Sequence, residues 1–285
     1  MSRVLIYNAL TQSKIDSLRR VFSDLALPGT GLVLEEVTHE NFSRRMGDDV
    51  ALLVLPGARA GSAYRDQLAG ENLVCLKHHL SHGMNMLGIC AGAYVMARQY
   101  EYYDYDSATG ALLERRIISG SDLGLAEVRA YGPDLRLYPL KPREEENPWS
   151  VYTAAQVSFP AEGQQEQAAL ALSKGPSFTH VGENVSVFAK YNETGEAAIV
   201  QFRHGRGGGL LSGPALEVGG QNLMHYVHPQ HREDPHCQSI ITQLENGREV
   251  WAKLWTEVFV RLIPDRPDIH AQVRRNFGVR EKPVF

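Results

Sequence analysis

Apolar residues recur with two different periods along the first hundred positions. Short, continuous apolar runs are typical of strands buried on both faces, and such runs occupy 3–8, 31–38, 49–58 and 84–90. Apolar residues at helical spacing predict a helix over 13–25, one or two helices over 64–83, a short helix over 39–46 and another over 93–100. This alternation of strand and helix predicts an α/β protein with a mostly parallel sheet and helices on both faces.

The pattern is less regular after position 100. A hairpin is predicted within 102–124, and strand-like runs lie at 185–191, 197–202 and 209–212, the first two joined by a turn at 192–195. A strongly amphipathic helix is predicted at about 247–263, and its apolar stripe is expected to pack on the core. We expect one domain over 1–285, in which an inserted region at about 110–190 adds strands or covers the site.

Composition and charge exclude several classes of function. A chain of 285 residues that is 43% hydrophobic can bury a substantial core, and its formal net charge of -4 predicts no general affinity for nucleic acid or anionic membranes. The longest apolar runs are too short to span a bilayer, and the first residues do not form a secretory signal. The cysteines, Cys75, Cys90 and Cys237, are too widely spaced for a disulfide framework, so a cytoplasmic location is expected.

The stretch GICAGAY places a cysteine between two glycines where a strand is expected to turn into a helix. Gly88 and Gly92 flank Cys90, and a sharp strand-to-helix turn of this kind, a nucleophile elbow, requires small neighbours. The turn points the thiol at a helix N-terminus, where the dipole and the unpaired N–H groups favour the thiolate. The alternative interpretation is a core cysteine, since free cysteines are among the most buried residues.

A second strand end supplies candidate donors for an oxyanion. In an elbow enzyme one donor is the N–H of the residue after the nucleophile, here Ala91, and another comes from a neighbouring loop at a strand end. Gly57 and Ala58 end the predicted strand 49–58, so their N–H groups are candidates. Pro-Gly alone indicates only a turn, but next to an elbow it favours acyl-transfer chemistry.

The stretches ALLVLPGARAGSAY and HGMNMLGICAGAYVMA resemble the class I glutamine amidotransferase-like superfamily, and most closely the N-terminal domain of eukaryotic-type biotin protein ligase. The resemblance covers most of the first hundred residues and, loosely, GGGLLSGPALE. It implies a flavodoxin-like sheet and a Cys–His–Glu triad. Glu217 stands at the glutamate position, but Ala215 stands where the family has its histidine, and Ala58 where the family has a second glycine.

The absent histidine leaves two functions open. A cysteine nucleophile needs a base to form its thiolate and an acid for the leaving amine, and Ala215 can be neither. His204, His225 or His228 could approach from a loop, although each one singly is typical of a surface or structural histidine. The first hypothesis is a cysteine-dependent amidase or hydrolase acting on a small amide or carbonyl substrate. The second is a non-catalytic binding or regulatory relative.

Two further motifs are interpreted as structural. HGRGGG is similar to a loop that binds biotinyl-adenylate in biotin ligases, but it lies between strand-like runs, without the long catalytic domain to which that loop belongs. The cluster of His228, His231, His236 and Cys237 matches no common zinc pattern. We expect no metal and no cofactor. The expected partners are a small-molecule substrate or ligand and, for a glutaminase, a separate synthetase or ligase protein.

Overall fold

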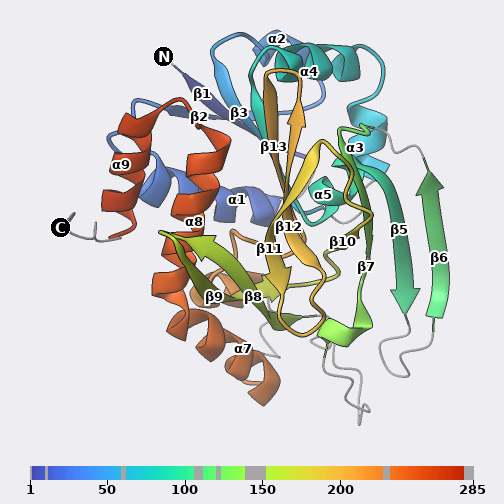
Figure 1. The fold of residues 1–285 in the computed structure, drawn as a ribbon, viewed down its shortest axis with the longest axis vertical. Helices are drawn as coiled ribbons and strands as arrows, with labels where there is room; N and C mark the ends of the chain where they lie inside the picture. Colours follow the sequence, from blue (N-terminus) through green and yellow to red (C-terminus); the bar gives the residue numbers. More distant parts are fainter. Residues whose placement is uncertain are drawn as a thin grey trace.

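The computed structural model describes residues 2–9, 12–58, 62–105, 112–119, 123–138, 152–226 and 232–278. The turn of the predicted hairpin, His228 and His231 lie outside these ranges. Within the ranges, no helix combines the length and the apolar character that a membrane crossing needs. Figure 1 shows the last two described helices, α8 (Arg248–Leu262) and α9 (Pro267–Asn276), on one side of the molecule. Strands β5 (Ala97–Tyr105) and β6 (Leu112–Ser119) lie on the other side.

The first part of the described chain alternates strand and helix, as its apolar pattern predicts. In chain order the elements are β1 (Arg3–Tyr7), α1 (Gln12–Arg20) with a following π-helical turn (Val21–Ala26), β2 (Val33–Val37), α2 (Phe42–Arg45), β3 (Val50–Leu55), α3 (Ser62–Gln67), α4 (Glu71–Ser81), β4 (Asn85–Ile89) and α5 (Ala91–Met96).

The central strands pair in parallel. Their order is β2–β1–β3–β4–β13, where β13 spans Gly207–Ser212, and every neighbouring pair among them is parallel. The carboxyl ends of parallel strands meet at one edge of a sheet. The segments that follow β1, β3, β4 and β13 therefore gather at the same edge. This confirms the predicted α/β fold with a parallel central sheet.

Alternate residues of β1 enter two different cores. Val4 and Ile6 pack in a cluster with side chains of α1 and of α8 (Arg248–Leu262). Leu5 and Tyr7 pack in a second cluster with side chains of α3, α4 and α5. Successive side chains of a strand point to opposite faces of the sheet. The continuous apolar runs in the sequence thus come from strands that are covered on both faces.

The second part of the chain extends the sheet, mainly with antiparallel pairs. The order continues from β13 as β12–β10–β7–β5–β6, and β11, β8 and β9 branch from β12. The predicted hairpin within 102–124 corresponds to the antiparallel pair β5–β6, and the predicted pair around 192–195 to β11–β12. The bounds are β5 (Ala97–Tyr105), β6 (Leu112–Ser119), β7 (Ala126–Gly132), a 3-10 turn (Leu135–Leu137), β8 (Thr153–Ala161), β9 (Gln164–Leu172), β10 (Ser177–Thr179), β11 (Val185–Tyr191) and β12 (Ala197–His204).

The predicted helix over 93–100 is wrong beyond Met96. Helix α5 ends at Met96, and β5 begins at the next residue. From Ala97 onward the chain pairs with β7, in parallel, and with β6, antiparallel. In these ladders the backbone N–H and C=O groups of the segment form hydrogen bonds. The segment is rich in tyrosine, a residue type that favours strands. The local apolar spacing is compatible with both structures, and pairing with distant strands decides between them.

Four helices end the described chain. They are α6 (Gly220–Tyr226), α7 (Pro235–Asn246), α8 and α9 (Pro267–Asn276). The predicted helix over 247–263 is confirmed as α8, whose buried side chains belong to the core that also holds α1. Asp234, just before α7, accepts hydrogen bonds from the N–H groups of His236 and Cys237 and caps that helix.

Candidate functional site

Cys90 lies at the junction of β4 and α5 in a strained backbone conformation. Its φ of 51° and ψ of -107° place a non-glycine residue at positive φ. The junction is held from both sides: the Cys90 N–H donates to the Ser212 carbonyl (2.8 Å), and the Cys90 carbonyl accepts from the Tyr94 N–H (3.1 Å). The predicted sharp strand-to-helix turn is present at this position.

The glycines on either side of Cys90 allow the helix to approach the sheet. A Cβ on Gly92 would lie 2.1 Å from the Leu55 carbonyl oxygen of β3, and a Cβ on Gly88 would lie 2.6 Å from the Met96 Sδ. Contacts below 3.0 Å do not occur for real Cβ atoms, so neither position accepts a side chain without movement of its neighbours. The predicted requirement for Gly88 and Gly92 follows from this close packing.

Gly57 and Ala91 lie next to the thiol. A Cβ on Gly57 would lie 3.5 Å from the Cys90 Cβ, so the end of β3 runs directly beside the elbow. The backbone N–H of Ala91, the residue after Cys90, lowers the pKa of this thiol. Ala58 follows Gly57, is partly exposed and packs against the core formed by α3, α4 and α5. The structure thus brings the candidate oxyanion donors Gly57 and Ala91 to Cys90.

Glu217 is fully buried beyond the end of β13 and has one charged neighbour among the described residues. Its side chain is 0% exposed, and neither carboxylate oxygen accepts a hydrogen bond from the described part of the chain. The Lys14 Nζ lies 3.6 Å from Glu217 Oε1. Lys14 belongs to the first turn of α1, directly after the carboxyl end of β1. Sequence reasoning missed it, although its place after a parallel strand puts it at the same sheet edge as Cys90.

The surroundings of Cys90 favour the protonated thiol. Its Sγ donates to the Ser173 carbonyl oxygen at 3.6 Å. Burial raises the pKa of the Cys90 thiol to about 11; the positive charge of Lys14 opposes this rise and the negative charge of Glu217 adds to it. The elbow alone therefore does not produce a thiolate at neutral pH.

A short segment between β9 and β10 packs against Cys90, which stays partly exposed, and three buried tyrosines hold this segment. The Tyr94 hydroxyl donates to the Lys174 carbonyl (3.1 Å), and the Lys174 N–H donates to the Tyr138 hydroxyl (2.7 Å). The Tyr191 hydroxyl donates to the Pro176 carbonyl (3.0 Å). Together with the Ser173 carbonyl, this segment places backbone polar groups over Cys90. Nothing in the local sequence of these tyrosines indicates that role.

The candidate base His204 lies at the wrong edge of the sheet. It pairs with Gly207 at the start of β13, and the next residue, Gly208, pairs with Asn85 at the start of β4. Cys90 follows the opposite end of β4. The whole length of a strand therefore separates His204 from the thiol. The cause is the direction of β12. Because β12 runs antiparallel to β13, its last residue, His204, lies at the edge of the sheet opposite the elbow.

The side chains of the other two candidate histidines lie outside the described part of the chain. His225 is on α6, and all of His228 lies outside that part. Ala215, at the family's histidine position, is 8% exposed and packs in an apolar cluster with residues of α7 such as Ile240 and Leu244. No histidine side chain in the described part of the chain replaces the histidine that Ala215 lacks.

The two motifs interpreted as structural occupy ordinary positions. HGRGGG forms the turn between β12 and β13 and the first half of β13. Its last glycines allow close strand packing, since a Cβ on Gly209 would lie 2.1 Å from the Met86 carbonyl oxygen. Cys237 is buried in the apolar cluster of α7. His236 Nε2 lies 3.3 Å from the Tyr152 carbonyl oxygen.

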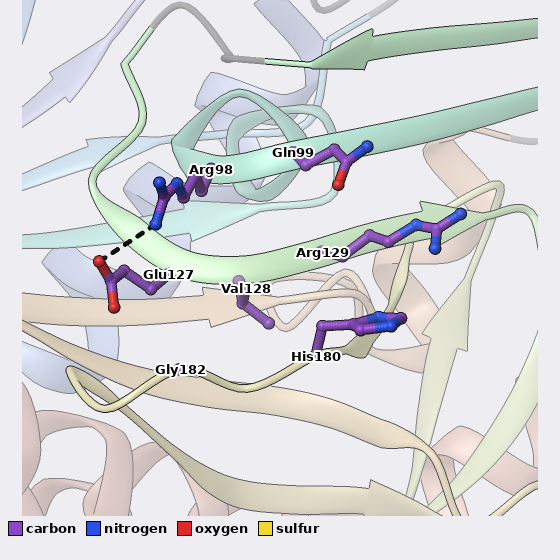
Figure 2. Close-up of a pocket in the computed structure, with 7 residues that line it drawn as sticks. All are labelled: Arg98, Gln99, Glu127, Val128, Arg129, His180 and Gly182. Carbon is purple, nitrogen blue, oxygen red and sulfur yellow. Dashed lines mark hydrogen bonds and ion pairs between the residues drawn. The ribbon is translucent and has the colours of Figure 1, made fainter.

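A separate hollow of about 360 Å³ lies over β5 and β7 (Figure 2). Its walls are Arg98 and Gln99 of β5, Glu127, Val128 and Arg129 of β7, and His180 and Gly182 after β10. Figure 2 shows Arg98 reaching Glu127, at 3.3 Å, and Arg129 forms an ion pair with Glu101. Both arginines therefore already have carboxylate partners. No elbow residue lines this hollow, and the chemistry-bearing groups gather at Cys90 instead.

The solved structures that are similar to this chain are distant from it in sequence. A glutamine amidotransferase shares 17% identity over 85% of this chain and 98% of its own, with a TM-score of 0.44. A protein from Thermoplasma acidophilum, provisionally described as part of a GMP synthase, shares 15% over 88% of this chain and 97% of its own (TM-score 0.45). A β-galactosidase from Bacillus circulans sp. alkalophilus shares 8% over 75% of this chain and 28% of its own (TM-score 0.42).

A comparison with curated proteins finds no match. The profile of one family, described as biotin-protein ligase, N terminal, matches residues 3–263. The match spans the parallel sheet, the elbow, the segment that packs against it, Glu217 and α8. The chain belongs to the biotin-protein ligase N-terminal family.

Proposed function

We propose that this protein is a cysteine-dependent enzyme that cleaves a small amide, either by hydrolysis or by transfer of its nitrogen, with Cys90 as the nucleophile. The observation that carries the proposal is the positive φ of Cys90 at the strand-to-helix junction. Such a conformation costs free energy, and residues held in it cluster at functional sites. At Cys90 this conformation is held by hydrogen bonds and close packing with β3, β13 and α5, which together fix the position of the sulfur.

The groups around the sulfur suit acyl transfer. Attack of the sulfur on a carbonyl carbon places negative charge on the carbonyl oxygen, and backbone N–H groups stabilise that charge when they are already in position. The Ala91 N–H directly follows Cys90 in the chain and lowers the pKa of its thiol, and Gly57 lies against the Cys90 side chain. These two backbone positions are the proposed oxyanion donors. The proposed substrate is small, because the segment Ser173–Pro176 packs against the thiol.

A second candidate function is supported by two specific observations. Ala215 fills the family's histidine position within an apolar cluster, and the Cys90 thiol, whose pKa is raised by burial, donates a hydrogen bond to the Ser173 carbonyl. Both fit a non-catalytic relative that uses the elbow to bind a small ligand. A separate synthetase that would use ammonia released here is a further proposal, and it applies only to the enzymatic function.

The test is acylation of Cys90. The protein is incubated at pH 8–10 with a panel of small primary amides and thioesters, L-glutamine included; intact mass and released ammonia are measured. We expect an acyl adduct on the wild-type protein that Cys90→Ser lacks, and ammonia release that this variant loses. Ammonia release of equal size in Cys90→Ser would exclude Cys90 as the nucleophile. Ligand binding to both forms without any adduct would favour the binding relative.

A further inference from the structure

The ion pair of Lys14 and Glu217 is largely buried and lies close enough to Cys90 for both charges to act on the thiol. Lys14 comes from α1, Glu217 from the segment after β13, and Cys90 from the elbow between β4 and α5. These three segments share the edge of the sheet where the parallel strands end. A nucleophilic thiol needs a group that takes its proton and later returns one to the leaving amine, and no described histidine side chain is there.

We propose that Lys14 is the proton-transfer group of this site, held by Glu217 and acting on Cys90 in place of a histidine. The turnover that this implies rests on the proposed function. The placement of Lys14 as the charge partner of the thiol has its own readout, which needs no substrate.

The position of the lysine stem supports this assignment. A Cβ on Gly57 would lie 3.5 Å from the Cys90 Cβ and 3.6 Å from the Lys14 Cε. The two side chains therefore flank the same glycine, and the lysine extends past it toward the site. The Lys14 side chain is 19% exposed, which leaves the ammonium mostly shielded from water. Shielding strengthens its electrostatic effect on a neighbouring sulfur.

Glu217 explains why the lysine stays there. A buried carboxylate without hydrogen bonds is costly unless an opposite charge compensates it. Lys14 Nζ, at 3.6 Å, provides that charge, while both carboxylate oxygens lack hydrogen-bond donors among the described residues. The pair thus resembles in arrangement the acid that orients a base in a catalytic triad.

The charges that act on the thiol are few. Lys14 lowers the pKa of Cys90, and Glu217 raises it by a smaller amount. The other titratable side chains that interact with Cys90 have their pKa values raised by burial and stay neutral throughout the range used for assay: Tyr64, Tyr94, Tyr138 and Tyr191. A change in the thiol's titration on substitution of Lys14 therefore reports on Lys14.

In the resting site Lys14 is the ammonium that pairs with Glu217. It enters the reaction by giving one proton to water. As the neutral amine it then takes the proton of the Cys90 thiol, which restores the ion pair, and the sulfur attacks the carbonyl carbon while the C=O electron pair moves to oxygen. The tetrahedral intermediate then breaks its C–N bond, the leaving nitrogen takes the proton from the Lys14 ammonium, and a thioester remains. Water attacks the thioester and gives a proton to Lys14. The C–S bond then breaks as the C=O bond re-forms, the carboxylic acid leaves, and the sulfur takes the proton back from Lys14.

The first experiment measures alkylation of Cys90 by iodoacetamide between pH 7.5 and 10.5 in the full chain, followed by peptide mass spectrometry to separate Cys75 and Cys237. Lys14→Met removes the charge, Lys14→Arg keeps it, and Lys77→Met removes an exposed lysine elsewhere as the matched control. We expect Lys14→Met to alkylate at least about threefold more slowly at each pH, a shift of half a pKa unit. Lys14→Arg and Lys77→Met should match the wild type. An unchanged rate in Lys14→Met would overturn the proposal.

A double variant keeps the test valid if the single one folds poorly. Lys14→Met leaves Glu217 buried without a cation, whereas Lys14→Met combined with Glu217→Gln leaves no charge unpaired. Because Lys14 acts on the thiol more strongly than Glu217 does, we expect the double variant to alkylate at a rate between those of the wild type and Lys14→Met. A double variant as fast as the wild type, with a wild-type circular dichroism spectrum, would show that Lys14 is not the thiol's charge partner.

Turnover gives the second readout and separates the two proposals. Arginine keeps its proton at any assay pH, so Lys14→Arg should alkylate normally and yet lose at least about a hundredfold in amide cleavage, the usual share of a general acid–base group. Full amide cleavage by Lys14→Arg would overturn the assignment of Lys14 while leaving Cys90 as the nucleophile. If no amide acylates the protein but the alkylation shift is present, the proposed enzyme function fails and the placement of Lys14 stands.

Discussion

At the scale of single residues, the site is defined by one strained cysteine and one buried carboxylate. Cys90 is held at positive φ, and Glu217 is fully enclosed with Lys14 as its compensating cation. Desolvation and the hydrogen bond to the Ser173 carbonyl favour the neutral thiol, while Lys14 and the Ala91 N–H favour the thiolate. The balance lies with the thiol, so the chemistry of this site depends on a group that removes a proton.

The raised pKa of Cys90 predicts a pH-dependent stability. A thiol in the unfolded chain titrates with a pKa near 9, and in the folded protein the pKa is about 11. Below pH 9 both states hold the proton and the contribution is fully present; above pH 9 the unfolded chain loses its proton first, and stability is lost as the pH rises toward 11. We expect wild-type stability to fall by about 1–2 kcal/mol more than that of Cys90→Ser between pH 8 and 10.5.

Urea unfolding at both pH values measures this difference. The tyrosines and the other cysteines are common to both proteins and cancel in the comparison. Parallel pH curves for the two proteins would mean that the Cys90 thiol titrates in the folded state as it does in the unfolded chain.

At the scale of elements, the elbow depends on how closely α5 approaches the sheet. The helix has six residues, all of them buried, and Gly92 sits against the Leu55 carbonyl of β3. The GICAGAY pattern predicts this junction because a sharp strand-to-helix turn requires small residues on both sides of the cysteine. The same pattern does not predict the end of α5 at Met96, since pairing of β5 with β7 and β6 is a long-range effect that local spacing does not carry.

We predict that Gly92→Ala prevents docking of α5 or costs more than about 3 kcal/mol of stability. The added Cβ would meet the Leu55 carbonyl oxygen, which belongs to the backbone and cannot change rotamer to make room. The matched control is Gly219→Ala, where a Cβ would meet nothing within 4 Å and the backbone has no positive φ. Thermal unfolding followed by circular dichroism compares the two variants with the wild type. Similar melting temperatures for both variants would contradict the close approach of α5 to β3.

At the scale of the whole molecule, the site is assembled from parts far apart in the sequence. Cys90, Gly57 and Glu217 could each be predicted from a motif or a strand end. The place of Lys14 after a predicted parallel strand indicates the edge of the sheet but not its closeness to the elbow, because the pairing of β1 with β3 is visible only in the folded sheet. His204 is a candidate in the sequence because its distance to Glu217 along the chain is short, whereas the antiparallel turn between β12 and β13 separates the two in space.

Helix α8 also holds the segment that precedes Glu217, through hydrogen bonds to one carbonyl group. Its apolar stripe packs on the core as predicted, but two of its indoles also donate to the Leu216 carbonyl: Trp251 Nε1 at 2.9 Å and Trp255 Nε1 at 3.0 Å. Leu216 directly precedes Glu217. The helix therefore anchors the backbone that presents the carboxylate to Lys14.

This anchoring predicts a difference between two core variants of similar severity. Trp255 is fully buried against Phe22 and Phe259, and Trp255→Ala should cost about 3–5 kcal/mol of stability. Leu80→Ala, in α4 near the opposite edge of the sheet, should cost about 2–5 kcal/mol. Under conditions where both remain folded, only Trp255→Ala should change the rate of Cys90 alkylation at pH 9, because only it releases the segment that carries Glu217. Equal rates in the two variants would mean that α8 stabilises the fold without positioning Glu217.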